Sequence, residues 1–313
     1  MNPCRTHPTP KPLCAVVGVV GRTNSGKSTL VNRLVGEKVS IVSPVVQTTR
    51  NTIRGILSEP RGQLVFLDTP GLHKAEGHLG TLMNRMARQA ASTVDIVLLV
   101  IDGSHQPQIE DDGWLRRLAH TEQPCVFLLN KSDREPLYTA EYQTLWATIL
   151  QEKGVTKEVL WMSASASGGA GVAAVADTLF TLAAPADELL FPDDVVSDYP
   201  RKLAIADVIR EKLFAKLMDE LPHEIAVRVD EIVEEGTDWH ITATILVNRY
   251  SQKGIVIGDK GRTIRTVKRG AEPEISDMFG IHAHLELWVK EEKNWMKNFF
   301  LLRQLGYIGD HIP

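Results

Sequence analysis

Cysteine is scarce in this chain, with three in 313 residues. A sparse, odd set without a repeated spacing excludes a disulfide framework and indicates a reducing compartment. No apolar run approaches the roughly 20 residues that a membrane span needs, and the proline-rich residues 1–12 lack the apolar stretch of a secretory signal. We therefore interpret residues 1–12 as a disordered tail and expect a cytoplasmic protein.

The chain also lacks an excess of positive charge, because 35 lysines and arginines face 39 aspartates and glutamates, for a net charge of −4. The molecule as a whole is therefore not an electrostatic surface for nucleic acid, and any such contact needs a local basic patch. What is present is an ordinary share of hydrophobic residues, 43%, and of charged residues, 24%. That balance predicts well-packed cores and, at this length, one to three domains.

Five short apolar runs alternate with helix-like segments over residues 13–184. They read LCAVVGVV, QLVFLDT, DIVLLVID, CVFLLN and EVLWMSA. Short, nearly continuous apolar strands between helices are typical of a parallel sheet that is covered on both faces. The pattern predicts a doubly wound, mostly parallel α/β domain that binds its ligand at the carboxyl ends of the strands.

A glycine-rich loop follows the first run and matches G-x-x-x-x-G-K-[ST], with Gly21, Gly26, Lys27 and Ser28 at the fixed positions. Glycines let consecutive N–H groups curl around phosphate, Lys27 would neutralise the β- and γ-phosphates, and the Ser28 hydroxyl would ligate Mg²⁺. The dipole of the helix that follows favours the same anion. The predicted phosphate contacts are Gly21, Arg22, Thr23, Asn24, Ser25, Gly26, Lys27, Ser28 and Thr29.

The loop alone does not choose between ATP and GTP, but the segment NKSD after the fourth run favours guanine. A carboxylate at Asp133 can accept both the N1–H and the exocyclic amine of guanine, a donor pair that adenine lacks. Asn130 would tie this loop to the phosphate loop, and the stem of Lys131 would lie over the base. A backbone N–H of Ala164 could meet guanine O6. The base contacts expected after the last run are Ser163, Ala164 and Ser165.

Two further segments occur along the chain in the order that is typical of nucleotide-dependent switches. In DTPG, Asp68 is placed to hold Mg²⁺ through water and the Gly71 N–H to bond the γ-phosphate. In QTTRNT, Thr49 is the best candidate to meet Mg²⁺ and γ-phosphate together, with Thr48 as the rival. We expect the γ-phosphate to order one switch around residues 47–54 and a second after Gly71. The nucleotide contacts predicted in DTPG are Asp68, Thr69, Pro70 and Gly71.

The predicted catalytic residues are Lys27, Thr49 and Gly71, and the predicted metal ligands are Ser28, Thr49 and Asp68. Leu72 stands where Ras-like enzymes carry a glutamine that orients the attacking water. Leucine cannot polarise water, so the attacking water must be positioned by the backbone, a partner or a cation. Asn24 could ligate K⁺ for this purpose, or it could only satisfy the backbone of the loop. No arginine finger is evident in the sequence, so we expect slow intrinsic turnover.

A change of pattern marks a second domain. Residues 185–200 carry three prolines and an acidic cluster, which is typical of an interdomain linker. Residues 201–313 begin with a helical pattern, continue with the alternating runs IAVRVDEIVEE and WHITATILVNRY, and close with the strand HLELWVKEE and a last helix. These features predict a small α+β domain.

The local basic patch lies in GIVIGDKGRTIRTVKR, which contains a G-x-x-G turn between two helical patterns. Glycines at both ends of the turn let a nucleic-acid backbone approach closely, and the helix N-terminus beyond it favours phosphate. A solvated basic helix face is the alternative. The predicted RNA contacts are Lys253, Gly258, Asp259, Lys260, Gly261, Arg262, Arg265, Lys268 and Arg269.

From Ala15 onwards the sequence resembles the Era family, the KH-domain GTPases of bacteria. In the first domain the likeness rests on GRTNSGKSTLVNRLVG, QTTRNTIRGI, FLDTPGLH, LNKSD and SAS. In the second it rests on IREKLF, ELPHEIAV, VIGDKG, HLELWVK and LGYI. Family members also carry a hydrophobic residue after DTPG, as Leu72 does here. The proline-rich extension before Leu13 and the stretch SASGGAGVAA depart from the family.

The resemblance implies a type II KH domain after the GTPase domain, and an enzyme that converts GTP and water to GDP and phosphate. It implies binding to the 3′ end of small-subunit (16S) ribosomal RNA, with a role in 16S processing and 30S subunit assembly, and a nucleotide state that sets whether the RNA is held. Mg²⁺ is the implied cofactor, with K⁺ as a second candidate. A monomer is expected, and some members associate peripherally with the inner membrane. The alternative is a membrane-associated or signalling switch whose C-terminal domain binds protein.

Overall fold

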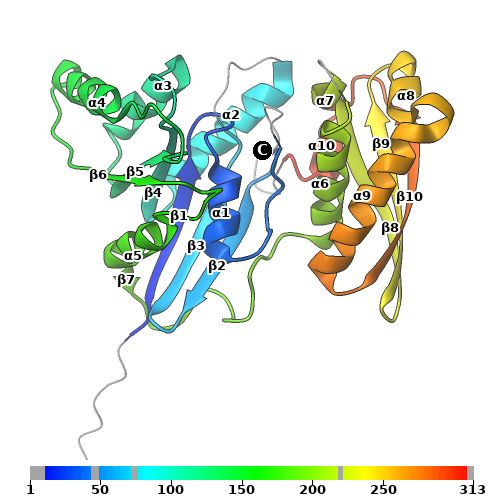
Figure 1. The fold of residues 1–313 in the computed structure, drawn as a ribbon, viewed down its shortest axis with the longest axis horizontal. Coiled ribbons are helices and arrows are strands. Elements are labelled where there is room, and N and C mark those ends of the chain that lie inside the picture. Colours follow the sequence, from blue (N-terminus) through cyan, green and yellow to red (C-terminus); the bar gives the residue numbers. More distant parts are fainter. Residues whose placement is uncertain (1–10, 44–48, 72–76, 218–220, 309–313) are drawn as a thin grey trace, which may run out of the picture.

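The computed structural model describes residues 11–43, 49–71, 77–217 and 221–308, which form two lobes (Figure 1). The predicted tail therefore lies mostly outside the described residues. Its last two residues, Lys11 and Pro12, contact the segment after the first lobe. The Lys11 ammonium lies 2.6 Å from the Asp187 carboxylate, and the Pro12 carbonyl accepts a hydrogen bond from the N–H of Ala186.

The first lobe is a twisted sheet with helices on both faces. Its elements are β1 (Leu13–Val20), α1 (Lys27–Val35), β2 (Ile53–Glu59), β3 (Gly62–Asp68), α2 (Gly77–Ser92), β4 (Ile96–Asp102), α3 (Ile109–Leu118), β5 (Cys125–Asn130), α4 (Thr139–Lys153), β6 (Leu160–Ala164), α5 (Val172–Leu182) and β7 (Ala184–Pro185). All five predicted apolar runs form strands.

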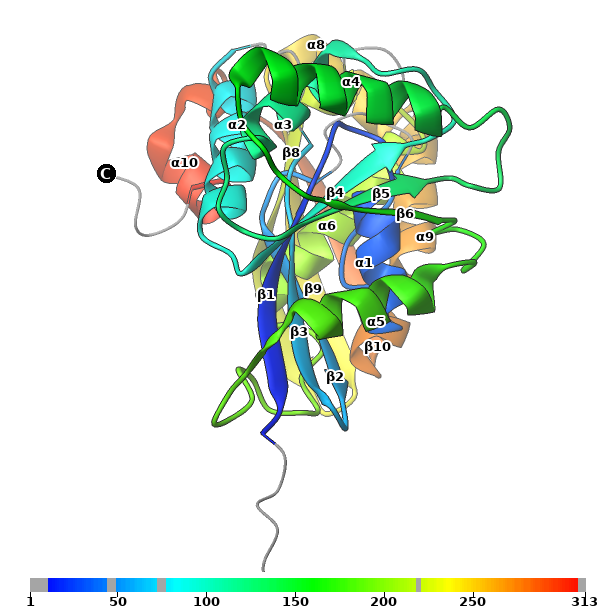
Figure 2. The same ribbon diagram turned by 90° about the vertical axis from the view of Figure 1, so that its left-hand side faces the viewer.

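The strand order is β2-β3-β1-β4-β5-β6, and β3, β1, β4, β5 and β6 run parallel. Helices α1 and α5 cover one face and α2, α3 and α4 the other, so the sheet lies between two cores (Figure 2). The predicted doubly wound, mostly parallel fold is confirmed. The carboxyl ends of the parallel strands meet at one edge, where the loops can surround a ligand.

Strand β2 was not predicted, and it pairs antiparallel with β3. Its apolar residues are interrupted at Gly55, which removes the alternation that would have identified a strand. The glycine has a packing reason, because a Cβ there would lie 2.8 Å from the Val31 side chain of α1. Helix α1 can therefore lie close to this edge of the sheet.

The predicted linker follows the edge strand β2 closely. The Ile56 N–H donates to the Val196 carbonyl at 2.9 Å, and the Ser197 hydroxyl donates to the Arg54 carbonyl at 2.6 Å. The Gln63 side chain makes two hydrogen bonds to the backbone of Phe191. Residues 191–197 thus form a strap on the first lobe before the chain enters the second.

The second lobe is a three-stranded sheet with helices on one face. Its elements are α6 (Arg201–Phe214), α7 (Leu221–Glu224), β8 (Ile225–Glu235), β9 (Asp238–Val247), α8 (Tyr250–Ile257), η1 (Asp259–Gly261), α9 (Arg262–Phe279), β10 (His282–Glu291), η2 (Trp295–Lys297) and α10 (Phe299–Gln304). Strand β9 pairs antiparallel with β8 and parallel with β10, and α6 and α9 pack on this sheet. This confirms the predicted α+β domain with a KH element order.

The C-terminal segment adds a fourth core between the lobes (Figure 1). Trp295, Leu302 and Tyr307 are buried against β8 and β9 residues of the second lobe and against Met83 of α2 in the first. Helix α2 begins six residues after Gly71, so the C-terminal residues up to Ile308 pack against the helix that follows the second predicted switch.

Candidate nucleotide-binding site

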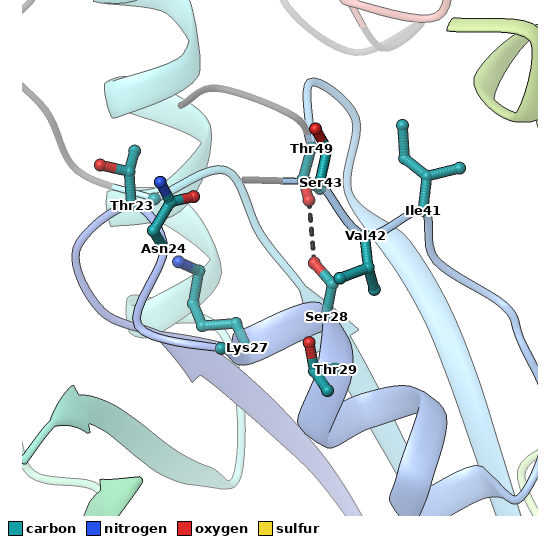
Figure 3. A pocket seen from close by; sticks show the side chains of 11 residues that line it. Thr23, Asn24, Lys27, Ser28, Thr29, Ile41, Val42, Ser43 and Thr49 are labelled. Atoms are coloured by element: carbon teal, nitrogen blue, oxygen red, sulfur yellow. Dashed lines mark hydrogen bonds between the residues drawn. The ribbon is translucent and has the colours of Figure 1, made fainter. Parts of the chain in front are cut away.

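The loop between β1 and α1 borders a pocket at the carboxyl edge of the sheet (Figure 3). Loop, helix α1, the first predicted switch and Gly71 all contribute to its wall. Gly21 and Gly26 have φ values of 147° and 98°, where a side chain is strained. The sequence pattern is thus matched by the backbone geometry that curls N–H groups around a phosphate.

Lys27 lies at the first turn of α1 with its ammonium inside the loop. It donates to the carbonyls of Arg22, at 2.8 Å, and Gly21, at 3.3 Å. Burial lowers the pKa of Lys27 to about 8, against the attraction of Asp68. A buried ammonium surrounded by N–H groups and carbonyls is suited to a multiply charged anion, which would raise this pKa again.

Three oxygen-bearing side chains converge on the candidate metal site. The hydroxyls of Ser28 and Thr49 lie 3.0 Å apart (Figure 3). Both carboxylate oxygens of Asp68 are buried, and within the described parts of the chain neither has a hydrogen-bond partner of normal geometry. Burial raises the pKa of Asp68, and Ser28 and Lys27 act against that rise. An unsatisfied buried carboxylate beside two hydroxyls fits an oxygen-liganded divalent cation such as Mg²⁺.

The DTPG segment is fixed against the phosphate loop. The Thr69 hydroxyl donates to the Val19 carbonyl at 2.9 Å. A Cβ on Gly71 would lie 2.6 Å from the backbone nitrogen of Thr23 and 2.8 Å from the Lys27 ammonium. The Gly71 backbone therefore faces the space that a γ-phosphate would occupy. Thr48 and Leu72 lie outside the described residues.

The NKSD loop is tied to the phosphate loop as predicted. The Asn130 side chain donates to the Ser25 carbonyl at 2.8 Å. Lys131 has a φ of 64°, and its ammonium reaches the carbonyl of Asn24 at 2.9 Å and Asp102 at 2.7 Å. The sequence analysis missed Asp102. Its burial is outweighed by hydrogen bonds from Lys131 and Ser104, so its pKa falls to about 2.

Asp133 is exposed, and a hydrogen bond from Ser165 lowers the pKa of its carboxyl. It is therefore ionised at neutral pH and can accept two hydrogen bonds. Ala164, by contrast, lies inside β6 beside Asn130 and its carbonyl accepts from Ser132. The sequence contains two overlapping SAS triplets, and we had assigned the first.

The second triplet is the one at the nucleotide edge. The Ala166 N–H donates to the Asn130 side chain at 2.9 Å, and Ala166 lines a hollow together with Thr29 of α1. Ser163 is exposed on β6, one strand residue before Ala164. The apolar run alone does not reveal where the strand ends, so Ala166, two residues further on, is a second candidate beside the predicted Ala164.

Arg22 was predicted as a nucleotide contact, but its guanidinium is held elsewhere. It lies 3.4 Å from both Asp102 and Asp111. Its backbone carbonyl, not its side chain, faces Lys27. The acids that hold it come from the ends of β4 and α3, far along the sequence, so the loop pattern could not identify them.

A serine and an asparagine before the first predicted switch were not predicted to matter. Asn32 of α1 accepts from the N–H groups of Val39 and Ser40 and donates to the Ser40 carbonyl. The Ser40 hydroxyl is buried beside Asp68, whose pKa it helps to lower. Helix α1 thus carries the phosphate site on its first turn and fixes the start of the switch on its second.

The G-x-x-G turn lies between α8 and α9, as predicted. Gly258 and Gly261 both have a φ of 74°, and Lys260 between them has a φ of 45°. Five of the six predicted basic residues lie in the turn or in the first half of α9 and are exposed, whereas Lys253 lies on α8 and is half-buried. Asp259 lies 3.9 Å from Arg262, and Lys268 lies 3.6 Å from Glu272. The patch is therefore open and positively charged.

Two families match separate parts of the chain: 50S ribosome-binding GTPases over residues 16–131 and KH domains over residues 220–296. An Era solved with MgGDPNP and nucleotides 1506–1542 of 16S ribosomal RNA has a TM-score of 0.85 and 31% identity, covering 95% of this chain and 99% of that one. A variant of Aquifex aeolicus Era bound to GDP·AlF4⁻ has a TM-score of 0.84 and 31% identity, covering 94% and 99%.

Proposed function

Because this chain belongs to the Era family of GTPases, we propose that it binds the 3′ end of 16S ribosomal RNA and promotes 16S processing and 30S subunit assembly. One observation carries the proposal. An open glycine turn precedes α9, whose first half carries exposed cations, in a chain that is 31% identical over almost its whole length to a protein solved with that RNA. Single-stranded RNA is the partner that such a KH turn accommodates.

The chain is a GTPase, and hydrolysis transfers the γ-phosphoryl group of GTP to water. In our assignment the loop N–H groups and Lys27 hold the β- and γ-phosphates, and the Gly71 N–H and Thr49 meet the γ-phosphate. Ser28, Thr49 and Asp68 would hold Mg²⁺, which when bound neutralises charge on the phosphate oxygens. The unsatisfied carboxylate of Asp68 supports this ligand set.

For the base we assign Asp133 to the N1–H and exocyclic amine of guanine. We assign the guanine O6 to the N–H of Ala166 rather than that of Ala164, because Ala166 lies beyond β6 next to Asn130. Asp133→Asn should therefore weaken GTP binding and improve binding of xanthosine triphosphate, whose O2 can accept from the new amide. Equal GTP affinity in the variant would remove Asp133 from the site.

The attacking water has no glutamine to orient it in this sequence, and we propose K⁺ as the cation that Asn24 helps to bind. Asn24 has a φ of 59° and faces the pocket (Figure 3). GTP turnover should be faster in K⁺ than in Na⁺ buffer, and Asn24→Ala should abolish the difference. Equal turnover in the two salts for the wild-type protein would exclude K⁺.

The RNA assignment is tested by crosslinking and sequencing of bound RNA, with a GTP analogue and with GDP. Reads should concentrate at the 16S 3′ end and change with the nucleotide. Replacing Gly258 and Gly261 with Asp should abolish this signal and leave GTP hydrolysis nearly intact. Gly236→Asp is the matched control, since Gly236 has a φ of 63° in the β8–β9 turn of the same domain. Unchanged RNA affinity in the double variant would contradict a KH role.

We further propose a GTPase domain over residues 13–184, a linker over 185–200 and a KH domain over 201–313, acting as a monomer in the cytoplasm. Among the described residues, none of the helices has the length and apolar character needed to cross a bilayer. Peripheral association with the inner membrane stays a prediction, to be tested by vesicle flotation. A GTPase that serves RNA modification would need a catalytic cysteine or a cofactor site, and Cys125 does not suit that role because it is buried in β5, where burial raises the pKa of its thiol to about 11.

A further inference from the structure

One residue of the first switch leaves its own domain and is buried in the other. Arg50 is 1% exposed. Its guanidinium donates to the carbonyls of Ile225, at 2.7 Å, and Pro222, at 3.0 Å, and to the Tyr307 hydroxyl at 3.3 Å. It also lies 5.7 Å from the ring centroid of Phe214 and 5.8 Å from that of Tyr307. All of these groups belong to the KH domain or to the C-terminal segment.

The groups that surround the Arg50 guanidinium, which we call its cage, compensate its charge only in part. Its hydrogen-bond partners are two carbonyls and a hydroxyl, which are neutral. The buried pair of Asp207 and Arg210, 2.7 Å apart, lies next to it, and Tyr307 accepts from both arginines. Burial accordingly lowers the pKa of Arg50. A buried cation without a carboxylate partner is stabilised only modestly, so it can be released at moderate cost.

The neighbour of Arg50 is Thr49, whose hydroxyl lies 3.0 Å from that of Ser28. Adjacent Cα atoms are about 3.8 Å apart, so the position of Arg50 in its cage restricts where the Thr49 hydroxyl can lie. Asn51, on the other side, donates to the Tyr199 hydroxyl, which in turn donates to Asp207 at 3.1 Å. Residues 49–51 therefore connect the metal site directly to buried groups next to the KH core.

A second connection holds the segment that precedes the same switch. The Lys38 ammonium lies 2.8 Å from Glu211 of α6 and 2.5 Å from Glu274 of α9, and the Val42 N–H donates to Glu211 at 3.2 Å. Helix α9 also carries the basic residues after the G-x-x-G turn. The described residues on either side of positions 44–48 thus both contact the KH domain.

We propose that Arg50 is a positioning residue through which the KH domain holds Thr49 in place for the metal and the γ-phosphate. The inference rests on the proposed function of this pocket as a GTP site. Because coupling between two sites is reciprocal, GTP that holds Thr49 also favours the caged position of Arg50, and with it one placement of the KH domain. GDP, which has no γ-phosphate, gains less from Thr49.

The test compares two nucleotides on the full-length protein carrying Arg50→Lys, which keeps the charge but cannot reach both carbonyls. We expect affinity for a fluorescent, non-hydrolysable GTP analogue to fall about tenfold or more, while affinity for fluorescent GDP stays within about twofold. The Mg²⁺ concentration needed for half-maximal analogue binding should rise. Tyr307→Phe, which removes one hydroxyl from the far side of the cage, should give a smaller loss in the same direction.

Arg61→Lys is the matched control. Arg61 is also stacked on an aromatic ring, 4.1 Å from Phe180, but it lies in the β2–β3 turn at the opposite end of the sheet from the pocket. The Arg61→Lys variant should bind both nucleotides with the affinities of the wild-type protein. If Arg50→Lys weakens GDP and the GTP analogue equally, Arg50 is merely structural. If it weakens neither, the cage has no influence on the site. Either result overturns the proposal.

A separate measurement distinguishes this inference from the proposed RNA function. With a 16S 3′-end oligonucleotide, the ratio of RNA affinities in the GTP-analogue and GDP states should approach one in Arg50→Lys. If the wild-type protein does not bind the oligonucleotide in either state, the RNA assignment fails, while the nucleotide comparison still decides the role of Arg50.

Discussion

The two glycine turns of this chain both precede a helix, but the protein encloses them very differently. In the phosphate loop, a Cβ on Gly21 would lie 2.3 Å from the Val100 carbonyl oxygen, and one on Gly26 would lie 2.2 Å from the Asn130 side chain. The loop is therefore wedged between a neighbouring strand and the base loop. Its cation, Lys27, is buried with it.

The G-x-x-G turn is open by comparison. A Cβ on Gly258 would meet the Thr263 hydroxyl at 2.2 Å, but one on Gly261 would find its nearest neighbour at 3.9 Å, and Lys260 is exposed. A buried, preorganised loop suits one small ligand of fixed shape, whereas an exposed turn suits a long polymer whose charge extends beyond it. The same residue type thus serves two kinds of phosphate recognition.

The largest effect should come from the enclosed turn. Gly26→Ala places a methyl group where φ is 98° and the Asn130 amide already lies. Strain of about 1–3 kcal/mol plus the clash should weaken nucleotide binding by roughly 100-fold. RNA binding without nucleotide should not change. Titration of fluorescent GDP and of an RNA oligonucleotide checks both, and an equal loss of the two would contradict independent sites.

The next largest difference between the two turns should appear in how strongly ligand affinity depends on salt. RNA affinity should fall by tens of fold between about 50 and 200 mM KCl, because each neutralised phosphate of a single strand releases counterions. GDP affinity should fall much less, because Lys27 is buried and poorly screened. Parallel titrations at constant Mg²⁺ measure the two slopes. Equal slopes would remove the contrast between a buried and an open site.

Within the open turn, the two glycines should differ. Gly258→Ala should weaken RNA binding about tenfold, since the turn must rearrange around Thr263, while Gly261→Ala should cost about two- to threefold from its positive φ alone. Fluorescence anisotropy with a 16S 3′-end oligonucleotide is the measurement. Equal losses would mean that the positive φ, and not the clash with Thr263, determines the loss of RNA affinity.

The smallest effect concerns pH. Burial lowers the pKa of Lys27 to about 8, and bound phosphate favours its charged form. Binding therefore takes up a proton once the pH rises through 8, and GDP affinity should fall several-fold between about pH 7 and pH 8.5. RNA affinity should change much less there, because the predicted RNA contacts on α9 are exposed and not buried as Lys27 is. Constant GDP affinity over that interval would mean that the pKa of Lys27 lies above about 8.

The parts predictable from sequence are those that depend on short-range chemistry. The phosphate loop, the NKSD tie through Asn130 and the G-x-x-G turn each rest on a few consecutive residues whose backbone geometry and donors are fixed by type. The preferred Thr49 has its hydroxyl 3.0 Å from that of Ser28, while its role at the metal stays a prediction. Local pattern was sufficient in these cases.

What the sequence did not reveal depends on partners far along the chain. The guanidinium of Arg22 is held by acids about 80 and 90 residues away, and Arg50 by carbonyls and a hydroxyl of another domain. The end of β6, and hence the choice between Ala164 and Ala166, depends on pairing with β5. No local pattern encodes such contacts.

The strap formed by residues 191–197 has a consequence for how the protein behaves when concentrated. Strand β2 is the outermost strand of its sheet, and an unpaired outer strand is a template for pairing with another molecule. Because the Val196 carbonyl accepts a hydrogen bond from the Ile56 N–H, the strap occupies part of that template. The connection between the domains thus also protects the sheet edge from pairing with another molecule. Shortening it would uncover β2 and promote aggregation, and it would also restrict the movement of the two domains.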